Sequence, residues 1–151
     1  MKKEKLQKAK DYAFNLLSYR DRSKYEIRER LKKKDYDDRI IEEVISKLVD
    51  LDYLDDRRFA RKWVKERINR KPRGRYMLKY ELKKKGIDNK IIANILNEMV
   101  NDQVEMDITE RLAEKWLLKN HSKKDRNVKL KRYLHNKGIT DYIINKYIHE
   151  K

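Results

Sequence analysis

The stretch LKKKGIDNKIIANILNEMV, residues 82–100, decides the fold because its pattern occurs three times along the chain. The other copies are LKKKDYDDRIIEEVISKLV at 31–49 and LHNKGITDYIINKYI at 134–148. In each copy the apolar residues of the second half fall in pairs at i, i+1, i+4 and i+5, the pattern of one apolar helix face. A helical pattern that returns after 51 and again after 52 residues predicts a tandem repeat.

Turn and cap residues occur at matching places in the three copies. The helix before the paired apolar residues is expected to end in the left-handed conformation, which glycine adopts freely and Asp tolerates. The residues at this turn are Asp35, Gly86 and Gly138. Two positions after this turn, each copy has a residue that can cap the next helix. These residues are Asp37, Asp88 and Thr140 in the first, second and third copies. Each copy is therefore a helix, a short turn and a second helix.

A third helix precedes this pair in every copy. Its pattern is Tyr12-Ala13-x-x-Leu16-Leu17, repeated as Phe59-Ala60-x-x-Trp63-Val64 and Leu112-Ala113-x-x-Trp116-Leu117. One such unit is short for independent stability, so neighbouring units are expected to stack. We predict an all-α protein, an elongated and curved array of three tandem three-helix repeats spanning residues 1–51, 52–101 and 102–151.

The segment YLDDRRFARKWVKER, residues 53–67, opens the second unit with two adjacent aspartates. Asp55 is predicted to be the N-cap of a helix, and Asp56 lies in its first turn, where the helix dipole favours an acid. Leu54 and Phe59 have the spacing of a hydrophobic staple. The aspartates are interpreted as helix caps and not as a catalytic pair.

Composition excludes several classes of protein. The 151 residues hold 42 Lys and Arg against 26 Asp and Glu, a formal charge of +16, so a polyanion such as phosphate is the expected partner. The absence of cysteine excludes disulfides and thiolate zinc sites. No stretch is apolar enough for a membrane span or a secretion signal, which predicts a cytoplasmic protein with no membrane partner.

No arrangement of residues predicts catalysis. The three histidines, His121, His135 and His149, are widely spaced and lack a metal-ligand pattern. A phosphate loop and a nucleophile elbow are also missing. The chain is predicted to be a binding protein with no cofactor, and not an enzyme.

The charge is segregated along the chain. Residues 61–85 hold twelve basic and two acidic residues, a net charge of +10, whereas residues 35–56 hold nine acidic and two basic ones. A second basic stretch, 119–132, has seven basic residues and one acidic. The loop NRKPRGR, 69–75, is four residues longer than its counterpart in the first unit, and lengthened loops often make contacts. A solvated loop without a ligand is the alternative.

Particular binding residues can be proposed from this charge. Four cations in and before the long loop are candidates for phosphate contact: Arg61, Lys71, Arg73 and Arg75. Tyr80 is expected to face solvent beside Lys79 and Lys83, where a tyrosine can stack on an unpaired base. The other large aromatics are expected in the core: Trp63, Tyr76 and Trp116.

Three stretches resemble the RecX family of regulatory proteins: residues 16–36, 53–67 and GRYMLKYELKKKGI at 74–87. The resemblance covers nearly the whole chain, and Asp35 departs from it because the family usually has glycine there. It implies a protein that binds the RecA recombinase and its filament and inhibits ATP hydrolysis and recombination, and we expect this protein to be a monomer. It also implies contact with single-stranded DNA, and double-stranded DNA is a second candidate partner. The residues on characteristic family positions are Arg20, Arg58, Arg67 and Gly74.

Two other functions fit the same sequence. The segment LKKKGIDNKIIANIL, 82–96, has the form of a helix-turn-helix and carries asparagines that could contact bases. A basic helical scaffold for other proteins, in which charge only aids solubility, is the second alternative. Whether RecA would be inhibited or stimulated, and through which surface, is not decided by the sequence.

Overall fold

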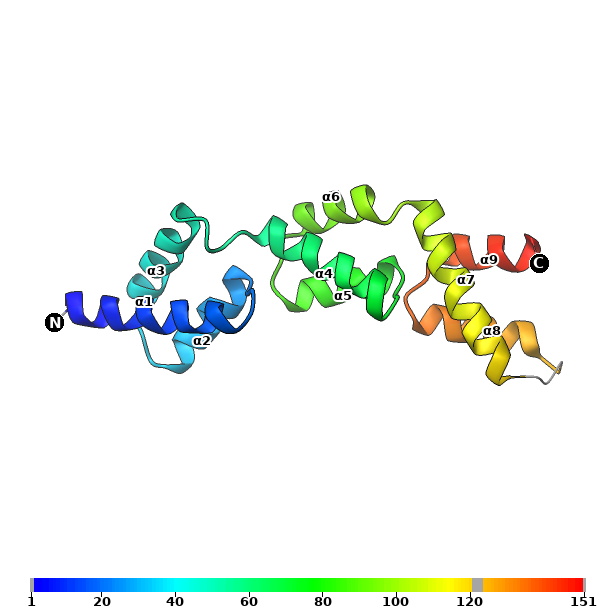
Figure 1. Cartoon of the computed structure of the whole chain (residues 1–151), viewed down its shortest axis with the longest axis horizontal. Coiled ribbons are helices and arrows are strands. Elements are labelled where there is room, and N and C mark those ends of the chain that lie inside the picture. The colour runs from blue at the N-terminus through cyan, green and yellow to red at the C-terminus, as the bar shows by residue number, and fades with distance from the viewer. Residues whose placement is uncertain (1, 121–123, 151) are drawn as a thin grey trace.

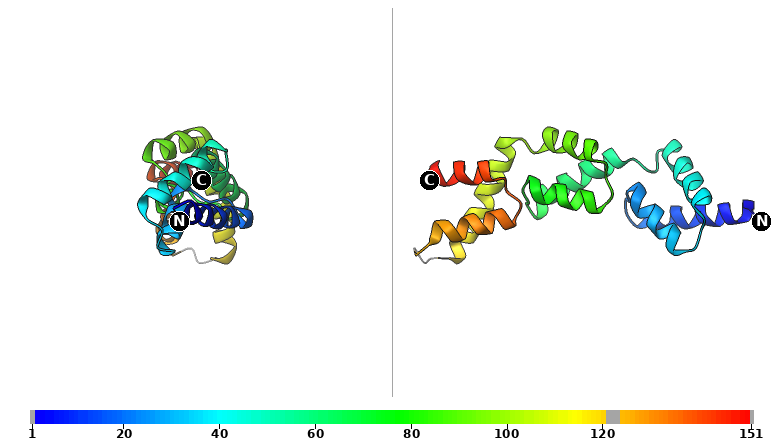
Figure 2. Two further views of the ribbon diagram at one scale, coloured as in Figure 1. Left: turned by 90° about the vertical axis from the view of Figure 1, so that its left-hand side faces the viewer. Right: turned by 180° about the vertical axis from the view of Figure 1, so that it is seen from behind.

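The computed structural model describes residues 2–120 and 124–150, and all regular structure in these ranges is α-helical. Figure 1 shows the helices as three groups in a row, with the N-terminus at one end and the C-terminus at the other, and Figure 2 shows the same row from behind. The helices are α1 (Lys2–Tyr19), α2 (Lys24–Lys33), α3 (Asp38–Asp50), α4 (Asp56–Arg70), α5 (Arg75–Lys84), α6 (Asn89–Met99), α7 (Asp102–Lys119), α8 (Arg126–Asn136) and α9 (Asp141–Glu150). The predicted elongated helical array is confirmed.

Side-chain caps begin α3, α4 and α6 at the predicted residues. Asp55 accepts from the backbone N–H groups of Arg57 and Arg58 at the start of α4, and Ser23 forms a full capping box with Glu26. The α3 and α6 N-caps are Asp37 and Asp88, as expected. The three predicted turn residues have positive φ, at 63°, 74° and 87° for Asp35, Gly86 and Gly138.

Each group of three helices encloses its own apolar core. The cores consist of residues from α1–α3, α4–α6 and α7–α9, and a fully buried alanine of the first helix lies in each: Ala13, Ala60 and Ala113. Leu54 belongs to the first core and Phe59 to the second. Ile68 and Val104 pack against both the second and the third core, so these two units share apolar contacts.

One aromatic prediction was wrong, and another is confirmed only in part. Tyr76 was expected in the core but is 54% exposed. The residues at the same repeat position in the other units, Tyr25 and Val128, are exposed to a similar extent. Trp63 and Trp116 are half-buried, because one side of each ring packs on its core while the other borders a surface hollow. An apolar residue at a repeated position is thus a junction or surface residue where its helix face points away from the unit's core.

The first and second units are joined in the same way as the second and third units. The start of α2 meets the end of α5, where the Ser23 hydroxyl donates to the Lys85 carbonyl at 2.6 Å. Correspondingly the start of α5 meets the end of α8, where the Gly74 N–H donates to the Lys137 carbonyl at 2.9 Å. A Cβ on Gly74 would lie 2.3 Å from the carbonyl oxygen of Gly138, so the second junction requires a glycine there.

Carboxylates close both junctions. At the first, Glu26 pairs with Arg20 at 2.6 Å and Lys85 at 3.3 Å. Burial would raise the pKa of Glu26, but hydrogen bonds from Arg20 and the Ser23 backbone, with the charge of Lys85, lower it below its usual value. Asp56 accepts from the Lys24 N–H at 3.0 Å, and burial raises the pKa of this carboxyl above its usual value.

At the second junction the carboxylate is fully buried. Glu105 of α7 is 0% exposed. It accepts a hydrogen bond at 2.8 Å from the backbone N–H of Arg75, which is the first residue of α5. It also accepts from the Thr140 N–H at 3.3 Å and the Thr140 hydroxyl at 2.6 Å, next to α9. The Thr140 side chain, predicted to cap α9, is therefore directed to Glu105. One carboxylate stabilises two helix starts from different units.

Among the described residues, no helix is both long and apolar enough to cross a membrane.

Candidate nucleic-acid interface

Four of the cations predicted to bind RecA or nucleic acid lie in ion pairs within the chain. Arg20 pairs with Glu26 as described above, and the three in α4 each have a partner of their own. These pairs are Arg58 with Asp52 at 3.3 Å, Arg61 with Glu98 at 3.4 Å and Arg67 with Glu81 at 3.1 Å. The first two α4 pairs are well exposed and easily exchanged for a ligand.

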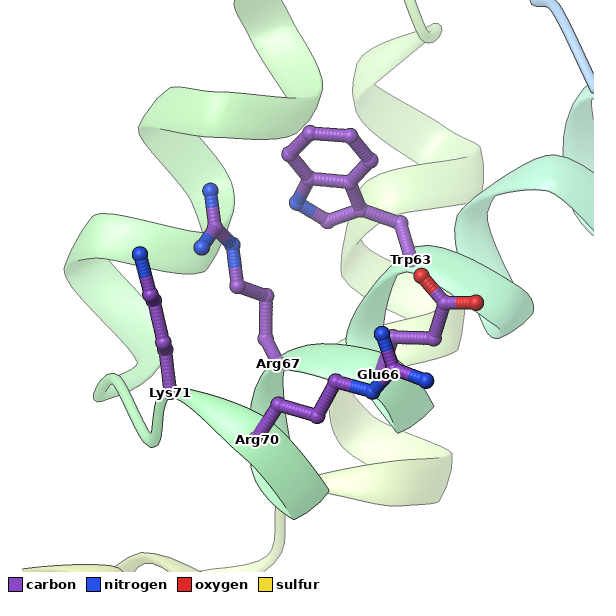
Figure 3. Close-up of a pocket in the computed structure, with 5 residues that line it drawn as sticks. All are labelled: Trp63, Glu66, Arg67, Arg70 and Lys71. Atoms are coloured by element: carbon purple, nitrogen blue, oxygen red, sulfur yellow. The ribbon is translucent and has the colours of Figure 1, made fainter. Parts of the chain in front are cut away.

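Arg67 takes part in a network around Trp63. Its guanidinium lies 5.1 Å from the centre of the indole, and Lys85 lies 5.3 Å from the same ring. Glu81 accepts from both Arg67 Nε and Trp63 Nε1. Figure 3 shows Arg67 next to this indole in a hollow of about 240 Å³ that Arg70 and Lys71 also line. Since the charge of Arg67 is satisfied, its role in this hollow is structural support.

A larger hollow lies where the second unit meets the third. This junction groove, of about 670 Å³, is lined by the end of α4 and the following loop on one side and by α7 and α8 on the other. Its lining residues are Asn69, Arg70, Lys71, Pro72, Arg73, Arg111, Leu112, Lys115, Trp116, Lys119, Tyr133 and Lys137. The predicted residues Lys71 and Arg73 are thus brought together with cations of the third unit.

The junction groove has seven basic residues and no acidic one in its lining. In the part of the chain that the structure describes, none of the seven takes part in an ion pair. Burial and the charges of Arg73 and Lys115 lower the pKa of Lys137 below its usual value. Uncompensated cations that repel one another this closely favour the binding of an anion, which relieves the repulsion.

Aromatic rings stand among these cations. Trp116 and Tyr133 stack with their centres 6.1 Å apart and their planes at 29°, and Lys137 Nζ lies 5.4 Å from the Tyr133 ring. A half-buried indole bordered by cations is the arrangement on which an unpaired base can stack while its phosphates meet Lys and Arg. The hollow of Figure 3, which Glu66 also lines, shares Arg70 and Lys71 with this groove, so the two hollows are neighbours.

Sequence reasoning missed the contribution of the third unit to this groove. The missed residues are Arg111, Lys115, Trp116, Lys119, Tyr133 and Lys137. A signal was present, because Lys115 and Lys119 lie one turn apart on α7 and share a helix face with Arg111. Only the junction between units brings that face opposite Lys71 and Arg73.

The remaining predicted residues lie outside the junction groove. Arg75 and Lys79 line a separate hollow between α5 and α6, and Arg75 Nη2 donates to Asn97 Oδ1 at 2.8 Å. Tyr80 is 54% exposed, as expected, with Lys84 Nζ 4.9 Å from its ring centre. The predicted cations are therefore divided between ion pairs, the junction groove and this second groove, whereas Tyr80 belongs to the lining of neither groove.

No group of three metal-ligating side chains occurs among the described residues. His135 lies 3.5 Å from Asp141 on the surface, and His149 is in the last turn of α9. His121 lies outside the described residues. The geometry supplies cations and aromatic rings, which are the means of binding a polyanion.

Fold and site together define the class, an all-helical array of three-helix units with a basic groove at a junction. Two family models match the chain: "RecX, first three-helix domain" over residues 9–48 and "RecX, second three-helix domain" over residues 55–96. The chain belongs to the RecX family of regulatory proteins.

Individual relatives agree with this assignment. The chain is 40% identical over 133 residues to the regulatory protein RecX of Pelodictyon phaeoclathratiforme, covering 87% of this chain and 81% of the relative. It is 33% identical to the Listeria monocytogenes protein of the same name over 145 residues, 96% of this chain but about half (51%) of that relative. The crystal structure of RecX from Lactobacillus salivarius superposes with a TM-score of 0.90 at 32% identity, covering 97% and 96% of the two chains.

Proposed function

We propose that this protein binds the RecA recombinase and its filament on single-stranded DNA, and that it inhibits ATP hydrolysis and recombination by RecA. The observation that supports the proposal most is family membership over both the first and the second unit. The elongated form of the array suits a partner that is itself a long assembly (Figure 1).

Direct DNA contact is the second part of the proposal, and the junction groove is its location. The groove combines an indole that a base can reach with seven cations that form no ion pair with any described residue. Electrostatic attraction first brings the chain to the DNA in the filament, and the groove then holds a few nucleotides. RecA contacts made by other faces complete the binding, which restrains the filament during its cycle of ATP hydrolysis.

The test is single-stranded-DNA-dependent ATP hydrolysis by a bacterial RecA during titration with this protein. Inhibition at protein levels well below those of RecA is the expected result, because each bound chain then affects many RecA subunits. Inhibition only after the DNA is saturated would mean simple competition for DNA. Unchanged hydrolysis at every ratio would contradict the RecA proposal.

Charge-reversal variants separate the DNA contact from the RecA contact. Lys115→Glu/Lys119→Glu changes two exposed residues of the groove wall, so the fold is expected to survive. We expect these changes to weaken binding to DNA alone more than inhibition of preformed filaments. The matched control is Lys3→Glu/Lys5→Glu, the same change of charge on exposed residues of α1. Equal losses in both double variants would mean that only the overall charge matters.

A further inference from the structure

The central unit has a second groove of a different chemical character. This α5–α6 groove, of about 490 Å³, has a row of cations from α5 along one wall and two asparagines of α6 along the other. The wall residues are Arg75, Lys79 and Lys83 opposite Asn89 and Asn97, and the apolar floor is formed by Ile92, Ala93 and Leu96.

The cations are regularly spaced. Residues 75, 79 and 83 are separated by four positions each, so they share one face of α5 and follow one another at about 6 Å. No acidic residue lines the groove, and within the described ranges none of the three cations forms an ion pair. The Asn97 amide only orients Arg75, since it carries no charge to neutralise the guanidinium.

The floor is aliphatic, unlike that of the junction groove. Ile92 and Leu96 are 1% and 4% exposed, and their inner sides belong to the core of the second unit. Between them in sequence, Ala93 is exposed and has a side chain of one carbon, which leaves room for a close approach. Tyr76, 54% exposed, stands at the rim. Because Ile92 and Leu96 are already buried, the apolar surface that a partner side chain can reach in this groove is Ala93 and the Tyr76 ring.

We propose that the α5–α6 groove binds an acidic amphipathic helix of a partner protein. Apolar residues of that helix cover Ala93 and the exposed part of Tyr76. Acidic residues at i, i+4 and i+8 pair with Arg75, Lys79 and Lys83, so charge complementarity sets the register. This inference goes beyond the proposed function, since it assigns protein recognition to one groove while nucleic acid occupies the other.

The partner helix does not come from this chain in its folded form. Among the described helices, α3 has the highest proportion of acidic residues, four in the thirteen residues DRIIEEVISKLVD. Its apolar residues Ile40, Ile41, Val44, Ile45 and Leu48 are all buried in the first core, so they cannot also cover the α5–α6 groove. A second folded copy would offer the groove only the charged face of α3.

The experiment measures fluorescence anisotropy of a labelled, designed peptide of about 20 residues, long enough for the three matched turns. It carries leucine on one face and glutamate at i, i+4 and i+8, and a second peptide has lysine in place of glutamate. Wild-type protein is expected to bind the glutamate peptide at least roughly tenfold more tightly than the lysine peptide, since opposite charges replace like charges at three positions.

Two variants test the two parts of the groove separately. Lys79→Glu/Lys83→Glu reverses the wall, and Ala93→Arg fills the floor while keeping good helix propensity. Both variants are expected to bind the glutamate peptide on the order of tenfold more weakly than wild type. Lys115→Glu/Lys119→Glu, in the junction groove, is expected to bind it with an affinity within about twofold of wild type. Binding of a labelled oligo(dT) probe is expected to show the reverse dependence.

The outcomes that overturn the proposal are distinct from failure of RecA inhibition, because no RecA is present. Failure of wild-type protein to bind the glutamate peptide overturns it, as does unchanged binding in Lys79→Glu/Lys83→Glu or Ala93→Arg. If Lys79→Glu/Lys83→Glu abolishes oligo(dT) binding and the peptide does not bind, the α5–α6 groove is a nucleic-acid contact instead.

Discussion

Replacing Glu105 by alanine is predicted to weaken the junction between the second and third units. The buried carboxylate accepts three hydrogen bonds, one from the Arg75 N–H and two from Thr140. Alanine leaves these donors without an acceptor at a part-buried site, at about 1 kcal/mol each. It also removes a negative charge from two helix starts, each stabilised by roughly 0.3–1 kcal/mol.

These losses are partly offset, because burying the carboxylate costs desolvation free energy and the alanine variant no longer has that cost. The net expectation for Glu105→Ala is a loss of roughly 3 kcal/mol of unfolding free energy, or about 6–12 °C in Tm for a chain of this size. Glu105→Gln keeps one oxygen for the two N–H donors, and its amide can donate to the Thr140 hydroxyl. It loses mainly the charge, so about 1 kcal/mol is expected.

The assay is thermal and urea denaturation followed by circular dichroism, with Trp116 fluorescence reporting the third unit in a Trp63→Phe background. Asp107→Ala is the matched control, because Asp107 is an exposed carboxylate of the same helix that accepts from Gln103. A Glu105→Ala protein as stable as Asp107→Ala would refute the reasoning. So would equal losses for the alanine and glutamine variants.

Three further predictions concern the junctions and the groove. Gly74→Ala places a Cβ 2.3 Å from the Gly138 carbonyl oxygen, so urea denaturation should show a loss above about 2 kcal/mol; wild-type stability would contradict the junction geometry. Trp116→Ala should weaken oligo(dT) binding in anisotropy titrations by about 1–3 kcal/mol, and an unchanged affinity would exclude stacking. Because the pKa of Glu26 is lowered from 4.5, its stabilisation is complete above pH 4.5 and is lost as pH falls through the lower folded value; Glu26→Gln should flatten this acid limb of the stability curve, and an identical limb would remove Glu26 as its cause.

Local rules predicted the helices well because each is set by neighbours in sequence. Asp37, Asp55 and Asp88 cap helices, since a side-chain oxygen two or three residues away reaches the free N–H groups of the first turn. Gly86 and Gly138 follow from the positive φ that ends a helix. The period of the apolar pairs revealed the repetition without any knowledge of contacts.

The candidate site depended on contacts between helices and between units, which the sequence pattern does not encode. Arg61 was chosen for its local charge and Arg67 for its place in the family pattern, yet their carboxylate partners, Glu98 and Glu81, lie on other helices. Thr140 was assigned to its own helix but donates to Glu105, 35 positions away. The junction groove likewise combines Arg73 with Lys115 only after the units stack.

The measurement that tests the central claim most directly is the salt dependence of oligo(dT) binding for three proteins. These are wild type, Lys115→Ala/Lys119→Ala in the junction groove, and Lys3→Ala/Lys5→Ala on α1. The two variants lose the same number of positive charges. If the groove holds phosphates, the slope of log Kd against log salt falls by about 1.4 in the first variant, at about 0.7 per contact, and is unchanged in the second. Equal slopes in all three proteins would contradict a DNA site at the junction of the second and third units.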